Sequence, residues 1–286
     1  MNIKKLINLP LHGPLVFVSL GFFGNYFYLF DLFSHFYLQL FVVNCIFLIW
    51  YIWLKNWFSS IVSLLLGLFL FVQLANADFS GIYSIKNITR NPDIFYMNTE
   101  FLNADISKIT DYIDKVQPKQ IALVELNKEL FENIKNDGKF KYSYYFPGLV
   151  FSFGFFTNEE VLDQKTYFSW WYPIGYFRTN KYSYYIIHPL PPFNNEQYQL
   201  QKNYFNFVSE LIKHEKNFVL VGDFNSSNYS QVYKSYFWEY TDNPIYSWWV
   251  DTILTIPIDH AISNKPLEVM PGIKLSSDHI PLLIKF

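Results

Sequence analysis

Charge is nearly absent from the first 76 residues, where the only Lys, Arg, Asp or Glu side chains are Lys4, Lys5, Asp31 and Lys55. Three apolar runs fill this region, at about Leu15–Phe30, Phe36–Trp53 and Phe58–Leu74. Each run has about the minimum length that crosses the hydrocarbon of a bilayer. Because helices without a polar face leave nothing for water to solvate, the runs predict three transmembrane helices rather than buried core helices. A lipid bilayer is accordingly the first predicted partner.

The short flanks of the runs predict the orientation. Lys4 and Lys5 precede the first run, and Lys55 lies between the second and the third. Asp31 lies between the first and the second. Because positive flanks stay inside, we expect a cytoplasmic N-terminus and an extracytoplasmic chain beyond residue 77. The tripeptide Ala75-Asn76-Ala77 also fits a signal-peptidase site, which leaves cleavage after Ala77 as an alternative.

Composition divides the chain into a membrane anchor at 1–77, a linker at 78–92 and a polar domain at 93–286. The whole chain has 22 Lys and Arg against 24 Asp and Glu, and three Lys but one Asp precede residue 77, so the remainder carries −4. A net negative domain disfavours nucleic acid as the partner, because phosphate backbones are bound by a basic face. The single cysteine, Cys45, lies in the anchor, which excludes a Cys-based zinc site or thiol nucleophile from the domain.

Strand and helix patterns alternate in the domain without a strict βαβ repeat. The predicted strands are Asp93–Asn98, Gln120–Val124, several antiparallel strands between Tyr142 and Ile187, Phe218–Val221, Pro257–Ser263 and Pro281–Phe286. The predicted helices are Ala104–Val116, Lys128–Asn136 and Glu196–His214. This mixture favours an α/β sandwich over a doubly wound parallel sheet.

Polar side chains follow or precede six of these apolar segments directly. They are Asn98 and Glu100, Glu125, His188, Asp223 and Asn225, Asp259 and His260, and Asp278 and His279. If the strands are neighbours, these groups converge on one rim. Carboxylate and amide oxygens suit a hard cation such as Mg²⁺, which would polarise a phosphoryl oxygen and assist an attacking water.

Two of these segments, Gly222-Asp223-Phe224-Asn225 and Ser277-Asp278-His279, resemble signatures of the endonuclease/exonuclease/phosphatase superfamily. The other polar segments fall in that family's order, so the resemblance covers about residues 92–286. It implies a four-layer fold in which two mixed sheets are stacked face to face between helices. Without this context, Asp223 and Asn225 would be ordinary turn residues.

The resemblance also implies the metal ligands. Glu125 would be the main ligand of a Mg²⁺ or Mn²⁺ ion, assisted by Asn98 and Glu100. The family usually has Asp- or Asn-type chemistry at the position of Glu100, so its role is the least defined. Asp278 would assist the metal or the hydrogen-bonding geometry.

Five further residues take catalytic roles by the same resemblance. Asp223 would orient or activate the attacking water, and Asn225 would hold a phosphate oxygen. His279, oriented by Asp259, would contact the phosphate. His188 matches the family's phosphate-contacting histidine, whereas His260 is expected to be structural.

The motif His188-Pro-Leu-Pro-Pro192, together with the anchor, is similar to a membrane-anchored bacterial subgroup that includes teicoplanin-resistance-associated proteins. This similarity implies a hydrolase at the outer face of the inner or plasma membrane, acting on a lipid-linked or other small phosphoester. An extracytoplasmic nuclease and an inactive ligand-binding envelope protein are the alternatives. Trp170 and Trp171 are expected either to pack in the protein or to dip into the bilayer interface.

Overall fold

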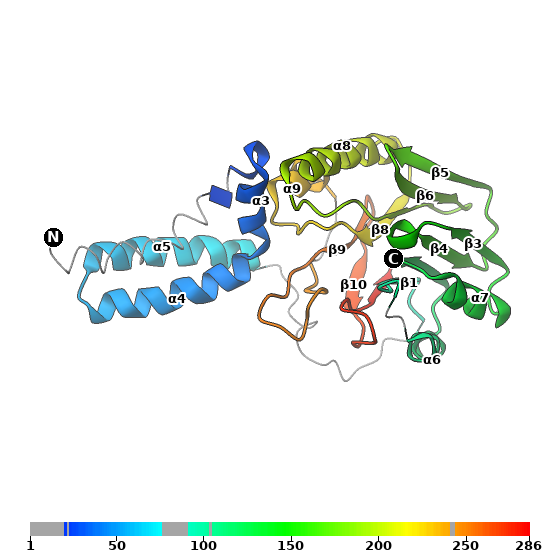
Figure 1. Ribbon diagram of the computed structural model, residues 1–286, viewed down its shortest axis with the longest axis horizontal. Helices are drawn as coiled ribbons and strands as arrows, with labels where there is room; N and C mark the ends of the chain where they lie inside the picture. Colours follow the sequence, from blue (N-terminus) through cyan, green and yellow to red (C-terminus); the bar gives the residue numbers. More distant parts are fainter. Residues whose placement is uncertain (1–19, 22, 76–90, 103–104, 241–243) are drawn as a thin grey trace.

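The computed structural model describes residues 20–21, 23–75, 91–102, 105–240 and 244–286 (Figure 1). A six-stranded mixed sheet has the order β10-β11-β1-β2-β4-β3. Its strands are β1 (Ile94–Asn98), β2 (Gln120–Val124), β3 (Tyr142–Phe146), β4 (Phe153–Thr157), β10 (Glu268–Pro271) and β11 (Leu282–Lys285). β1 pairs with β2 in parallel and with β11 antiparallel, so β1 lies near the middle of the sheet.

A five-stranded mixed sheet has the order β5-β6-β7-β8-β9. Its strands are β5 (Asp163–Ser169), β6 (Tyr172–Arg178), β7 (Ser183–Ile187), β8 (Phe218–Asp223) and β9 (Asp259–Ser263). β7 and β8 pair in parallel, with Ile187 opposite Gly222, and the other neighbours are antiparallel. Because parallel strands end at the same edge, the two parallel pairs fix where the polar residues that follow them lie.

The two sheets pack face to face and helices cover their outer faces (Figure 1). The core between the sheets joins Tyr96 and Phe155 of one sheet to Phe177 and Val221 of the other. Helices α6 (Ile106–Val116) and α7 (Lys128–Asn136) cover the six-stranded sheet. Helices α8 (Asn195–Ile212) and α9 (Gln231–Phe237) cover the other. The predicted architecture of two mixed sheets flanked by helices is confirmed.

Most predicted elements appear within a residue or two of their expected ends, and the helix at Lys128–Asn136 matches in full. Two elements, α9 and β10, have no counterpart in the sequence prediction. α9 has seven residues and is too short for a helical period to show. Its N-cap is Ser230, whose hydroxyl accepts the amides of Val232 and Tyr233. Most of the predicted linker lies outside the described residues.

Helices α4 (Tyr37–Trp53) and α5 (Trp57–Leu74) form a hairpin that projects from the domain (Figure 1). Within the described part, α5 alone is long and apolar enough to cross a membrane. α3 (Tyr28–His35) and α4 meet that test only as a pair bent by 74°. The expected three transmembrane helices are therefore not all found, and residues 15–19 and 22 of the first apolar run lie outside the described residues. Its last part forms η2 (Gly24–Tyr26) and the start of α3, which pack against α9 of the C-terminal domain.

The docking of α3 uses its polar residues. Asp31 is buried, and its carboxylate accepts hydrogen bonds from the Ser230 hydroxyl at 2.7 Å and the Gln231 amide at 2.8 Å. His35 is also buried, and its Nδ1 accepts the Ser227 amide at 3.0 Å. Asp31, which the sequence places between the first two apolar runs, holds the N-terminal end of α9.

Candidate active site

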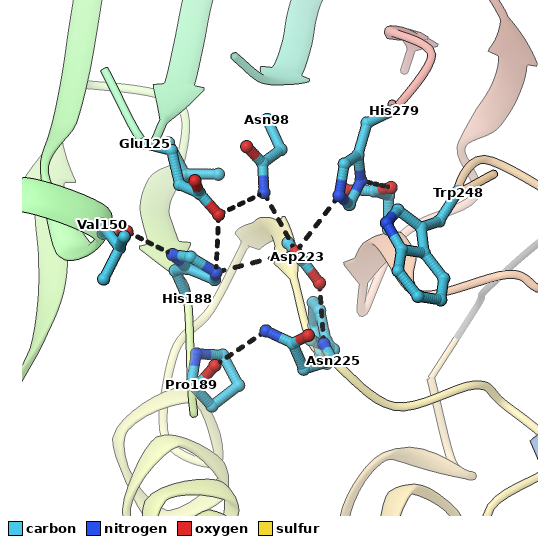
Figure 2. A network of polar contacts seen from close by, with 12 residues as sticks. Asn98, Glu125, Val150, His188, Pro189, Asp223, Asn225, Trp248 and His279 are labelled. Atoms are coloured by element: carbon cyan, nitrogen blue, oxygen red, sulfur yellow. Dashed lines mark hydrogen bonds and ion pairs between the residues drawn. The ribbon is translucent and has the colours of Figure 1, made fainter. Parts of the chain in front are cut away.

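Five strands bring their polar ends to one place between the sheets (Figure 2). Asn98 ends β1 and Glu125 follows β2. His188 follows β7, Asp223 ends β8 and Asp259 begins β9. The convergence predicted from the sequence is therefore present, and its cause is the pairing of β1 with β2 and of β7 with β8.

Asn98 joins the two sheets at the centre of the site. Its buried Nδ2 donates to Glu125 Oε1 at 2.9 Å and to Asp223 Oδ2 at 3.0 Å. Its Oδ1 accepts the backbone amide of Glu100 at 3.0 Å. Glu100, Glu125 and Asn225 all have positive φ, between 48° and 52°. Non-glycine residues rarely adopt this conformation, and such strain tends to gather at functional sites.

His188 faces the same two carboxylates. Its Nδ1 lies 2.8 Å from the Val150 carbonyl, which only accepts, so Nδ1 carries a proton. The opposite nitrogen, Nε2, lies 3.5 Å from Glu125 Oε1 and 3.6 Å from Asp223 Oδ2. When His188 is neutral, its Nε2 therefore carries a free lone pair. When His188 is protonated, the N–H at Nε2 can donate a hydrogen bond to a phosphate oxygen.

Asp223 occupies the middle of the constellation and is 2 % exposed. Burial raises the pKa of its carboxyl to about 6, although the nearby imidazole of His279 works in the opposite direction. The Asn225 amide donates to Asp223 Oδ1 at 2.8 Å, and Asn225 Nδ2 donates to the Pro189 carbonyl at 3.0 Å. Gly222 permits close pairing here, since a Cβ at this position would lie 2.2 Å from the Ile187 carbonyl oxygen.

Asp259 and His279 form a buried ion pair with 2.6 Å between Oδ2 and Nδ1. Burial alone would lower the pKa of His279, but the carboxylates of Asp259, Asp223 and Asp278 together outweigh it, with Asp259 contributing most, and raise the pKa to about 10. Burial works against the charge of Asp259, yet its pKa is lowered overall by His279 and by hydrogen bonds from Ser247 at 2.6 Å and Tyr96 at 2.9 Å. His279 is therefore an imidazolium at neutral pH, with Nε2 3.7 Å from Asp223 Oδ2.

Asp278 and Glu100 lie together beside this pair. The Asp278 amide donates to Glu100 Oε2 at 3.1 Å, and Asp278 Oδ1 lies 3.7 Å from His279 Nε2. The Trp248 indole donates to Asp278 Oδ2 at 2.7 Å. All nine residues predicted for the site thus belong to one connected network.

The sequence of residues 95–279, which is more than half of the chain, matches the sequence model of the Endonuclease/Exonuclease/phosphatase family. The chain belongs to this family. No curated protein sequence matches the chain. The membership makes the protein a metal-dependent hydrolase of phosphoester bonds, as the sequence predicted.

Solved structures of the family share the fold. An AP endonuclease from Archaeoglobus fulgidus superposes with a TM-score of 0.57 at 13% identity, covering 68% of this chain and 98% of that protein. The 3′ phosphatase NExo from Neisseria, bound to a product DNA hairpin, gives 0.54 at 14%, covering 68% and 98%. The human Nocturnin catalytic domain gives 0.53 at 14%, covering 72% and 98%. At these identities the likeness shows the fold alone.

The site fits the divalent metal that the family uses. Ligand atoms of Glu125, His188 and Asp223 lie within 4.8 Å of one another, and so do those of Asp223, Asp259 and His279. The carboxylates of Glu125 and Asp223 both accept from the buried amide of Asn98. Two negative groups this close favour a cation between them, and their oxygens suit Mg²⁺ or Mn²⁺. The first group contains Glu125, the predicted main ligand, next to Asn98. Glu100 and Asp278 lie on the other side, beside His279. The roles of Glu125, Asn98, Glu100 and Asp278 as metal ligands all stay predictions.

Several contributors to the site carry no motif. Tyr96, Ser247 and Trp248 reach Asp259 or Asp278 only through tertiary contacts, so nothing in their local sequence could mark them. His260 is buried and its Nε2 lies 2.9 Å from the Ser226 carbonyl, which agrees with its expected structural role. Trp170 and Trp171 form the exposed β5–β6 turn, so they do not pack in the core, and their contact with a bilayer stays a prediction.

Proposed function

We propose that this family member is a phosphatase or phosphodiesterase that acts at the outer face of a membrane on a lipid-linked or other small phosphoester. The observation that carries the proposal is the position of Asp223. It lies between Asn98, Glu125 and His188 on one side and the Asp259–His279 pair on the other. A phosphate placed there would contact both the residues proposed to hold the metal, beside Glu125, and the imidazolium of His279.

The chain's own residues divide the chemistry between them. Asp223 receives a proton from the water that attacks phosphorus, since its carboxyl has a pKa near neutrality. His279 and Asn225 donate to phosphate oxygens, and His188 Nε2 is placed to do the same when protonated. The P–O bond to the leaving oxygen breaks, and that oxygen takes a proton from solvent. A metal held at Glu125 would polarise the phosphoryl group and stabilise the charge that develops.

The burial pattern of the α4–α5 hairpin supports the membrane setting, because it is inverted relative to a soluble protein. The polar Asn44 and Ser63 are buried between the helices, with Ser63 donating to Asn44 Oδ1 at 2.8 Å and Asn44 to the Ser63 carbonyl at 3.0 Å. Large apolar side chains such as Ile46, Ile49 and Leu65 are more than half exposed. This arrangement suits lipid, in which helices pair through small and polar side chains.

The hairpin also supports the proposed orientation. α4 and α5 leave the domain and return to it, with Lys55 at the far turn and Asp31 docked on the domain. If both helices span the membrane, Lys55 lies on the side opposite to Asp223. The positive-inside rule then assigns the catalytic domain to the extracytoplasmic side.

A nuclease is the second candidate, because solved structures of this fold include an AP endonuclease and a phosphatase bound to DNA. Against it, residues 77–286 carry a net −4 and contain only two arginines, Arg90 and Arg178. A phosphate backbone would gain little attraction from such a domain.

The test is a substrate panel for the full-length protein reconstituted in vesicles with Mg²⁺ or Mn²⁺. We expect release of phosphate or head group from polyprenyl phosphates or phospholipids to exceed the cleavage of single- and double-stranded DNA. Preferential DNA cleavage would replace the proposal by the nuclease. Metal binding without turnover of any ester would favour the inactive ligand-binding protein.

A further inference from the structure

The segment between Trp249 and Leu254 is an ordered protrusion with apolar side chains on its outside. Ile253 is 87 % exposed, and Trp249 and Leu254 are about two-fifths exposed. The backbones of Trp248 and Ile256 pair at its base, and the Thr252 amide closes a turn on the Trp249 carbonyl at 2.9 Å. Exposed apolar groups gathered on an ordered loop indicate a contact surface.

This segment is attached to the membrane-anchor hairpin. Gln39, in the first turn of α4, donates from Nε2 to the carbonyls of Ile253 at 3.0 Å and Thr255 at 2.8 Å. Beside it, Tyr246 is buried in a cluster with Leu70 at the end of α5. In Figure 1 the segment is the orange loop on the hairpin side of the domain. The segment therefore lies against the domain end of the hairpin.

The same segment forms part of the active site. The Trp248 indole binds Asp278, and its ring stacks on Trp249 with centroids 4.2 Å apart and planes 16° apart. The Trp249 amide donates to the Asp278 carbonyl at 3.0 Å. A partner that contacts Trp249 therefore lies next to Trp248, whose indole binds Asp278 in the site.

The charge of the loop limits the kinds of partner that it can bind. Asp251 is its only charged residue between Ser247 and Ile256, and its carboxylate is paired with Lys274. The loop therefore presents apolar surface to its partner. It has no unpaired cation that could attract a nucleic acid or an anionic protein surface. Apolar side chains on a short loop beside a membrane hairpin suit the interfacial region of a bilayer, where indole rings are favoured.

We infer that residues 249–254 insert into the surface of the bilayer that holds the hairpin, so that the active site opens onto lipid head groups. This inference rests on the proposed membrane setting and deepens it, because it names the surface through which a lipid-borne phosphoester reaches Asp223. Binding is by apolar burial, so it does not require anionic lipid.

The test places a single spin label on the full-length protein in phosphatidylcholine vesicles, with Cys45→Ala to remove the native thiol. Labels enter at Ile253→Cys, at Ile49→Cys on α4 and at Trp238→Cys, a site 72 % exposed at the end of α9. We expect the label at 253 to collide more with oxygen than with a water-soluble nickel chelate, as the label at 49 does, and the label at 238 to show the reverse.

The three labels separate the possible failures. Labels at both 49 and 253 in water would contradict the membrane setting of the proposed function. A label at 49 in lipid with one at 253 in water would overturn the loop inference alone. As a second measurement, Ile253→Asp should lower the ratio of lipid-ester to soluble-ester turnover at least fivefold, and Trp238→Asp should not. Equal ratios in the two variants would also overturn it.

Discussion

The charge on His279 depends most on one neighbour, although Asp223 and Asp278 also favour it. Asp259 contacts it at 2.6 Å and is itself fixed by Tyr96 and Ser247. We therefore treat Asp259 as a positioning residue that keeps the imidazole protonated and aimed at Asp223. His279 has a different role in our proposal, in which it donates to a phosphate oxygen.

Asp259→Asn should lower the pKa of His279 from about 10 toward its ordinary range, because the largest favourable charge is removed while burial remains. The measurement is an NMR pH titration of the metal-free protein. Asp114→Asn, a change at an exposed helix position, is the matched control and should leave the His279 pKa in place. An unchanged His279 pKa in Asp259→Asn would contradict the pairing.

Glu125→Gln should weaken Mn²⁺ binding by about 10–100-fold, since even partners of metal ligands contribute this much and Glu125 contacts the cation directly in our proposal. Calorimetric titration of the metal-free protein measures it. Glu129→Gln, in the first turn of α7, changes a charge nearby in sequence but outside the site and serves as the control. Equal affinities in the two variants would remove Glu125 from the metal site.

Among the elements, α3 has the role that hydropathy could not reveal. Its sequence reads as a continuation of apolar runs, yet Asp31 and His35 hold residues 227–231, which follow Asn225 in the β8–α9 connection. α3 thus stabilises the connection that contains Asn225, the residue that we propose holds a phosphate oxygen.

Asp31→Ala should destabilise this docking by about 1–3 kcal/mol, because the Ser230 hydroxyl and the Gln231 amide lose a buried acceptor. Chemical unfolding of the full-length protein in detergent, followed by near-ultraviolet circular dichroism, measures the change. Asp111→Ala, on the exposed face of α6, should change the unfolding free energy by less than about 0.5 kcal/mol. Equal effects would show that α3 does not depend on Asp31.

Elements with strong local patterns were predictable from the sequence. β1, β2, α7 and α8 follow from apolar runs or periodicity, and Asn98 at the end of β1 and Glu125 after β2 belong to the candidate site. The partners of Asp259 were not predictable, because Tyr96 and Ser247 meet it across 163 and 12 residues. Strand order decides those contacts, and no local signal specifies it.

For the whole molecule, composition predicted a membrane anchor at 1–77 but not the way in which its helices fold. Three apolar runs predicted three spans, and hydropathy alone cannot distinguish a span from a helix whose polar face packs on its own domain. In the structure, α3 turns by 74° from α4 and keeps Asp31 and His35 inward, while Leu29 and Phe27 stay exposed. The anchor and the catalytic domain are therefore one packed unit.

In our proposal, Asp223 lies between the metal site at Glu125 and the imidazolium of His279, and these groups together hydrolyse a membrane-borne phosphoester. The most direct measurement is phosphate or head-group release from lipid phosphoesters by the full-length protein in vesicles, with Mn²⁺ or with chelator, beside Asp223→Asn. We predict turnover that chelator abolishes, that Mn²⁺ restores and that Asp223→Asn lowers by about 10²–10⁴-fold. Turnover that survives in the folded variant, or that persists without metal, would contradict the claim.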